Sequence, residues 1–267
     1  MNIQEITLIG GRDKNGELET IREVNFRMGN IVSIVGPTGC GKTTLINDIE
    51  LYADGNTPSG RVVKIDGRIR SQDADGDPSH NPISLISQHT NFLSDLPVQE
   101  FIEIHASIRK LADGTTAVRE TFDFANQLTG EPLLPSAPMT ELSGGQTRAL
   151  LIADAVVIGN APIILLDEIE NAGIHRTKAL ELLRRYEKIF IFVTHDPRIA
   201  LLSDFRIVMR NGAMIRTIER DDDEQIVAAE IRKLDDLLLH FRGQIRAGQR
   251  LTSQELTERL RALGYIS

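Results

Sequence analysis

Short runs of apolar and β-branched residues recur along most of the chain, and polar turn residues separate them. Runs of this kind are typical of β-strands, and runs without polar interruption are typical of parallel strands that are buried on both faces. Helical patterns follow several of the runs, so the sequence predicts an α/β fold. The expected strands are residues 3–9, 31–35, 61–66, 83–87, 163–166, 189–193, 207–209 and 214–218.

The strand signal disappears between residues 89 and 142, where a helical pattern takes its place. We interpret this stretch of 54 residues as a helical subdomain inserted into the α/β body. A further helix is predicted at Ala149–Ile158, and Asn211-Gly212 predicts the turn of a hairpin that closes the domain near residue 218.

Residues 219–267 form a separate C-terminal extension with its own helical pattern. Its acidic run Glu219–Glu224 is interpreted as a solvated hinge, and Thr252 with Glu255 predicts a capped second helix that ends at Gly264. Between them, one apolar stripe predicts a long helix that packs either on its own domain or on a partner. The stripe is Val227, Ile231, Leu234, Leu238, Phe241 and Ile245.

Composition narrows the classes of function. With 41% hydrophobic and 25% charged residues, the chain has the makeup of a globular protein with a core. Its net charge of −8 argues against a nucleic-acid partner. The only cysteine, Cys40, excludes an intrachain disulfide and fits a reducing, cytoplasmic setting. We find no signal peptide and no apolar run near the roughly 20 residues that cross a bilayer, so we expect no direct membrane insertion.

A glycine-rich segment that begins at Gly36 fits the phosphate-binding pattern G-x-x-x-x-G-K-[ST] between a predicted strand and a predicted helix. Glycines let backbone amides curl around a phosphate, and the start of the helix adds its positive end. We expect Lys42 to reach the β- and γ-phosphates and the Thr43 hydroxyl to bind magnesium. The expected nucleotide-binding residues are Gly36, Pro37, Thr38, Gly39, Cys40, Gly41, Lys42, Thr43 and Thr44.

Two carboxylates, Asp167 and Glu168, follow the apolar strand 163–166. They stand at its carboxyl end, where open α/β sheets bind ligands. We expect Asp167 to hold hydrated magnesium and Glu168 to act as the general base for the attacking water. An isolated Asp-Glu pair is usually a solvated turn, but the glycine loop in the same chain favours the catalytic interpretation.

A second glycine-rich turn, Leu142–Gln146, opens a predicted helix and offers backbone amides to an anion. One nucleotide does not need two such turns from one chain, so we expect this one to cap the γ-phosphate held by a second subunit. With these motifs in this order, residues 1–218 resemble the ATP-binding cassette (ABC) ATPases. The resemblance implies a P-loop NTPase core with an antiparallel β subdomain and an inserted helical subdomain, followed here by the C-terminal helical extension.

The resemblance also implies roles for further residues. Gln88 stands at the family's lid glutamine, which touches the metal, and His195 stands at its switch histidine, which contacts the γ-phosphate. The family hydrolyses ATP with Mg²⁺ in a head-to-tail dimer, which here is a homodimer or a heterodimer with another ABC ATPase. The residues that would close over the partner's nucleotide are Ser143, Gly144, Gly145 and Gln146.

Two segments depart from the family pattern. No aromatic residue precedes Phe26, so Ile9 or Arg12 would have to cover the base, and we predict weak discrimination between ATP and GTP. After Glu168 the family commonly has Pro-Thr-Ser-Ala-Leu-Asp, whereas this chain lacks the aspartate that couples the two sites. The string 167–174 is similar to the ATPase component of the methyl-coenzyme M reductase activation system.

Two kinds of partner protein are consistent with the sequence. One is a membrane permease, whose cytoplasmic helix would dock on residues after Gln88, with the chain at the inner face of the membrane. The other is a soluble client such as a metalloenzyme, which the loop after Glu168 and the C-terminal extension favour. A DNA-repair ATPase is disfavoured because only 54 residues separate Gln88 from Leu142, too few for a long coiled coil. The expected docking residues are Phe92, Leu93, Leu96 and Val98.

Overall fold

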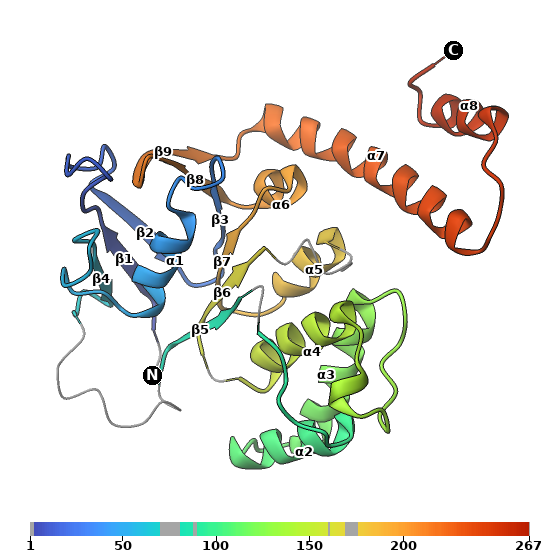
Figure 1. Ribbon diagram of the computed structural model, residues 1–267, viewed down its shortest axis with the longest axis horizontal. Helices are drawn as coiled ribbons and strands as arrows, with labels where there is room; N and C mark the ends of the chain where they lie inside the picture. The colour runs from blue at the N-terminus through green and yellow to red at the C-terminus, as the bar shows by residue number, and fades with distance from the viewer. Residues whose placement is uncertain (1–2, 70–80, 88–89, 160, 169–175, 267) are drawn as a thin grey trace. The chain divides into compact units, whose positions relative to one another are not determined.

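A computed structural model describes residues 3–69, 81–87, 90–159, 161–168 and 176–266 (Figure 1). The chain divides into two compact units, Met1–Glu219 and Arg220–Ser267. None of the helices in the described part of the chain is both long enough and apolar enough to span a bilayer.

A six-stranded sheet with the order β5-β6-β7-β3-β8-β9 forms the centre of the first unit. Its first five strands in this order are parallel, and β9 pairs with β8 in the antiparallel direction. All five residues of β7 are buried, which explains the uninterrupted apolar run in the sequence. The strands are Ile31–Val35 (β3), Ile83–Ile86 (β5), Ile163–Asp167 (β6), Ile189–Val193 (β7), Phe205–Arg210 (β8) and Ala213–Glu219 (β9).

A smaller antiparallel sheet with the order β2-β1-β4 lies beside the central one (Figure 1). It contains β1 (Glu5–Ile9), β2 (Glu23–Arg27) and β4 (Val62–Ile65). β2 is not among the strands expected from the sequence, because only two of its residues, Val24 and Phe26, are apolar. Two inward-facing side chains are enough for a strand that is buried on one face.

Helices cover both sheets and form a separate helical layer (Figure 1). In this layer the described residues between 90 and 142 contain helices and no strand, as predicted. Phe124 and Leu128 of α3 belong to the same apolar core as Ala149 and Ile152 of α4, so α4 extends the layer beyond residue 142. The helices of the first unit are α1 (Lys42–Glu50), α2 (Val98–Ile108), α3 (Gly114–Leu128), η3 (Met139–Glu141), α4 (Gly144–Val157), α5 (Arg176–Leu183) and α6 (Pro197–Leu202).

A fully buried arginine, Arg61, joins α1 to the elements around it. Its Nη1 lies 2.9 Å from Oδ2 of Asp48 on α1, and its Nη2 lies 2.6 Å from Oε1 of Glu19. The same Nη2 donates to the carbonyl of Gly212 in the β8–β9 turn, at 2.5 Å. The other oxygen of Glu19 accepts a hydrogen bond from the amide of Met214. This ion cluster therefore joins α1 to Glu19, in the segment between β1 and β2, and to the β8–β9 hairpin.

The C-terminal unit consists of α7 (Asp222–Arg246) and α8 (Ser253–Ala262). The division between the two units falls within the acidic run, between Glu219 and Arg220. Asp221 caps α7 by accepting a hydrogen bond from the amide of Glu224, and Asp222, Asp223 and Glu224 lie in the first turn of the helix. Carboxylates are stabilised by the positive end of a helix, which favours this arrangement. Thr252 caps α8 as predicted, but the Glu255 carboxylate accepts a hydrogen bond from Gln244 of α7.

The apolar stripe of α7 is exposed rather than covered by α8. Val227, Leu234, Leu238 and Ile245 are between 43% and 61% exposed. The hydrogen bonds of α7 with the rest of this unit involve other residues: Gln244 and His240 contact Glu255 of α8, and Glu230 accepts a hydrogen bond from Tyr265, which follows α8.

We predict that Arg61→Met lowers the free energy of unfolding by about 3–5 kcal/mol, because it leaves two buried carboxylates without their cation. Urea denaturation followed by circular dichroism measures this change. Lys64→Met, on β4 three residues after Arg61, is the matched control and should cost less than about 0.5 kcal/mol. Equal stability of the two variants would show that the Arg61 cluster does not hold the elements together.

Candidate functional site

Three neighbouring parallel strands, β6, β7 and β3, deliver the candidate residues to one edge of the central sheet. Val193 at the end of β7 pairs with Asp167 of β6 on one side and with Ile34 of β3 on the other. The three strands therefore end at the same level, at one edge of the sheet. Asp167 ends β6, and the glycine-rich segment, Glu168 and His195 come after the ends of β3, β6 and β7.

The glycine loop has a backbone that side chains would obstruct. Gly36 has φ 152°, and a Cβ atom there would lie 2.4 Å from the carbonyl oxygen of Met209. Gly41 caps α1 with φ 102°, and its Cβ would approach Gly212 to 3.0 Å. Glycine is therefore required at both positions, and the result is a tight turn at the N-terminus of α1, the geometry that suits a phosphate group.

Lys42 places its charge inside this loop. The side chain is only 7% exposed, and its Nζ donates hydrogen bonds to the carbonyls of Gly36 at 3.0 Å and Pro37 at 3.1 Å. Thr43 and Thr44 are exposed on the first turn of α1. Elsewhere in the loop, Pro37, Thr38 and Gly39 are exposed, whereas Cys40 is buried.

Glu168 of the acidic pair lies near His195, the second residue after β7. Asp167 is the half-buried last residue of β6, and Glu168 comes next with φ 48°, a left-handed conformation that is uncommon for a side chain of this size. The Glu168 amide donates to the Val193 carbonyl at 3.0 Å. Its Oε1 lies 3.7 Å from Nε2 of His195, so the structure brings Glu168 and His195 together.

Arg148 on α4 is a neighbour of the site that the motifs did not reveal. Its Nη1 donates to the carbonyl of Ser87, which directly precedes Gln88 in the chain. Burial lowers the pKa of the Arg148 guanidinium, and the nearby charge of Asp167 acts in the opposite direction. The only sequence signal is a single arginine in an otherwise apolar stretch of helix, and such a signal does not identify its contacts.

The second glycine-rich turn lies in the helical layer, at the start of α4. Ser143 caps the helix, and a reciprocal pair of hydrogen bonds joins it to Gln146, a complete capping box. Ser143 and Gly144 are exposed, and Gly145 and Gln146 are half-buried. In the described part of the chain, no hydrogen bond or ion pair joins this turn to residues 36–44.

Gln88 and the loop 169–174, which are also expected near the site, lie outside the described residues. The two residues proposed to cover the base are both described: Ile9 is half-buried at the end of β1, and Arg12 donates from Nη1 to the carbonyl of Gly16 at 2.8 Å.

The residues at this sheet edge fit a magnesium nucleotide. Thr43 and Asp167 offer hard oxygen ligands of the kind that Mg²⁺ prefers. The described residues contain no group of three or more histidine, cysteine and acidic side chains able to hold a metal by themselves. Magnesium is commonly bound through one or two protein oxygens together with substrate phosphates, so this sparse set is consistent with that ion.

Comparisons with known proteins identify the family. The ABC transporter family matches residues 21–171. The chain is also 48% identical over 257 residues to an ABC transporter ATP-binding protein of Methanocaldococcus jannaschii, across 96% of this chain and 98% of the relative. The chain therefore belongs to the ABC transporter ATP-binding family, and it is an ATPase. The expected family and fold are confirmed.

More distant relatives agree with this assignment. A spermidine/putrescine import ATP-binding protein of Photobacterium profundum is 30% identical over 89% of this chain and 62% of its own length. A solved dimeric ATP-binding cassette bound to ADP and Pi has a TM-score of 0.61 and 25% identity, over 81% of this chain and 99% of that one. These relatives give no support to a particular kinship with the methyl-coenzyme M reductase activation ATPase.

Proposed function

We propose that this chain is the ATP-hydrolysing subunit of a membrane transporter and works in a head-to-tail dimer that closes over two Mg-ATP. The dimer is a homodimer or a heterodimer with another ABC ATPase. The observation that carries the proposal is that two glycine-rich turns, each at the start of a helix, lie in different layers of the molecule. One holds the buried Lys42 at the edge of the sheet, and the other presents the exposed Ser143 on the helical layer.

Gly144 supports the participation of a second subunit. A Cβ atom on Gly144 would meet nothing within 4 Å, and its φ is not in the left-handed range. Alanine stabilises a helix by up to about 1 kcal/mol relative to glycine, so the fold of this chain gives no reason for glycine here. A close approach by a group from outside the chain provides one. The dimeric form of the related cassette bound to ADP and Pi favours the same arrangement.

Each residue of the proposed site has a chemical role. Glu168 accepts a proton from the attacking water, while the oxygen of that water bonds to the γ-phosphorus and ADP leaves. His195, next to Glu168, contacts the γ-phosphate, and Lys42 neutralises the β- and γ-phosphates. Magnesium supplies charge neutralisation at the phosphate oxygens when it is bound. We assign Thr43, Gln88 and Asp167 as the magnesium ligands. We assign nucleotide binding to residues 36–44 of one chain and to residues 143–146 of the partner subunit.

We predict that Glu168→Gln lowers ATP turnover at least about 100-fold while nucleotide binding persists, because the amide cannot accept the proton. The variant should also accumulate with Mg-ATP as a particle of two 29.6 kDa chains, measured by size exclusion with light scattering. Glu187→Gln, an exposed glutamate, is the control and should keep normal turnover. Normal hydrolysis by Glu168→Gln would exclude Glu168 as the base.

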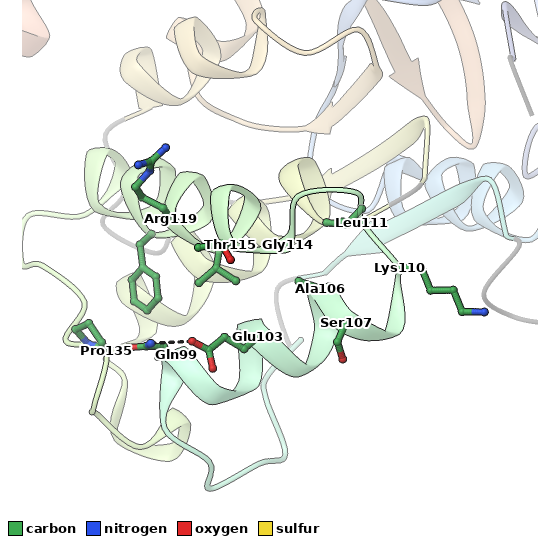
Figure 2. Close-up of a pocket in the computed structure, with 12 residues that line it drawn as sticks. Gln99, Glu103, Ala106, Ser107, Lys110, Leu111, Gly114, Thr115, Arg119 and Pro135 are labelled. Carbon is green, nitrogen blue, oxygen red and sulfur yellow. Dashed lines mark hydrogen bonds between the residues drawn. The ribbon is translucent and has the colours of Figure 1, made fainter.

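A groove on the helical layer supports docking of a permease helix. It lies between α2 and α3, has a volume of about 630 Å³, and combines apolar walls with charged residues (Figure 2). Beside it, Ile108 of α2 is 68% exposed. The apolar walls include Ala106, Leu111, Val118 and Phe122, and the charged residues are Glu103, Lys110 and Arg119. In this proposal the chain works at the cytoplasmic face of the membrane, without inserting into it and without a nucleic-acid partner.

The four docking residues expected from sequence differ in exposure. Leu93 is 101% exposed and is open to a partner, whereas Val98 is 0% exposed in the apolar core and cannot contact one. Phe92 is half-buried, with its ring 5.1 Å from that of Phe101. Val98 is the first residue of α2, whose apolar face turns inward, so its side chain belongs to the core.

We predict that Leu93→Glu retains basal ATPase activity but loses a multi-spanning membrane protein that the wild-type chain holds during affinity purification from detergent-solubilised membranes. A charge at a desolvated contact is unfavourable, whereas an exposed leucine contributes little to the fold. Leu51→Glu, the same substitution at an exposed leucine of the α/β body, is the control and should keep the partner. Recovery of a soluble metalloenzyme instead would favour the soluble-client alternative.

A further inference from the structure

A second lysine lies against the glycine loop, and no motif predicted it. Lys14 belongs to the turn between β1 and β2, and its Nζ donates a hydrogen bond to the carbonyl of Gly39 at 2.7 Å. Gly39 is three residues before Lys42 in the loop, so two ammonium groups border the same short backbone segment.

The position of Lys14 is fixed by the elements that also fix the loop. Its amide donates to the carbonyl of Asn211 in the β8–β9 turn at 3.0 Å, and Asn211 in turn donates from Nδ2 to a carboxylate oxygen of Asp13. The adjacent Gly212 donates its amide to the carbonyl of Cys40 at 2.8 Å. The N-terminal turn, the hairpin turn and the glycine loop therefore form one hydrogen-bonded assembly with Lys14 at its rim.

We propose that Lys14 binds the phosphates of the nucleotide held by the glycine loop, an inference that rests on the proposed nucleotide site at residues 36–44. An ammonium group has three N–H donors, and the bond to Gly39 uses one of them. A nucleotide di- or triphosphate carries several negative charges, and a charge-assisted hydrogen bond is stronger than the bond to a neutral carbonyl.

This contact differs in kind from an aromatic stack on the base. The N-terminal turn contains no aromatic side chain, but it contributes a cation. A cation that pairs with phosphate draws affinity from a group that all nucleotides share, so Lys14 should strengthen binding equally for adenine and guanine nucleotides. Because the Lys14 contact is exposed, its effect should weaken as salt rises.

The test compares the wild-type chain with Lys14→Met, which keeps an aliphatic side chain and removes the charge. Titration calorimetry with Mg-ADP and Mg-GDP, and competition by Mg-pyrophosphate, report three ligands that share phosphates but not a base. Lys14→Met should weaken all three by about tenfold and by a similar factor, the size expected for one charge-assisted hydrogen bond. Lys14→Arg should restore most of the affinity.

Two controls separate the outcomes. Lys64→Met makes the same change of net charge on β4 and should leave all three affinities unchanged. The melting temperature of Lys14→Met without nucleotide should match that of the wild type, because the removed contact is exposed. Unchanged affinities in Lys14→Met, or a loss for ADP with none for pyrophosphate, would overturn the inference. Failure of the wild-type chain to bind Mg-ADP would instead refute the proposed nucleotide site.

Discussion

The close contact between the glycine loop and the β8–β9 hairpin is the constraint on which the rest of the site depends. The hairpin's backbone leaves no room for side chains at Gly36 or Gly41, so the loop can follow only one path. The buried Arg61 donates one hydrogen bond to the carbonyl of Gly212 in the hairpin turn. It donates another to Asp48 on α1, the helix that follows the loop. These contacts favour one backbone path for the loop, and a preorganised loop lowers the entropic cost of binding a phosphate.

The architecture also underlies the proposal that each nucleotide site is completed by a second chain. The sheet edge brings the loop, Glu168 and His195 together through strand register, because these residues follow adjacent parallel strands. Ser143 and Gly144 belong to the helical layer, where they start a helix that packs on its neighbours. A second copy can supply this turn to the first, and the family to which the chain belongs includes cassettes solved as dimers.

The sequence was a good guide wherever a local rule determines the structure. The all-apolar run 189–193 became β7 with the same bounds, and Asn211-Gly212 forms a hairpin turn with both residues at positive φ. Local rules failed for β2, whose burial depends on its neighbours in the sheet rather than on its own composition. The acidic residues 222–224 were not predicted as helical, because charge predicts solvation equally well for a loop and for the first turn of a helix.

The site shows the same division between local and long-range information. The glycine loop and the acidic pair have motifs of fixed spacing, so their residues could be named in advance. Arg148 and Lys14 have none, because their importance arises from contacts with Ser87 and Gly39, far away in the sequence. Such contacts depend on how the layers and turns pack, and a single sequence does not specify them.

The claim that the two anion-binding turns act on one nucleotide across a dimer can be tested by mixing two inactive variants. Glu168→Gln removes the base, and Gly144→Asp places a negative charge in the exposed turn. In a head-to-tail homodimer, each mixed pair contains one intact composite site, so an equal mixture should recover about a quarter of wild-type turnover. If both turns instead serve the same chain, every site carries a defect, and the mixture will be as inactive as each variant alone.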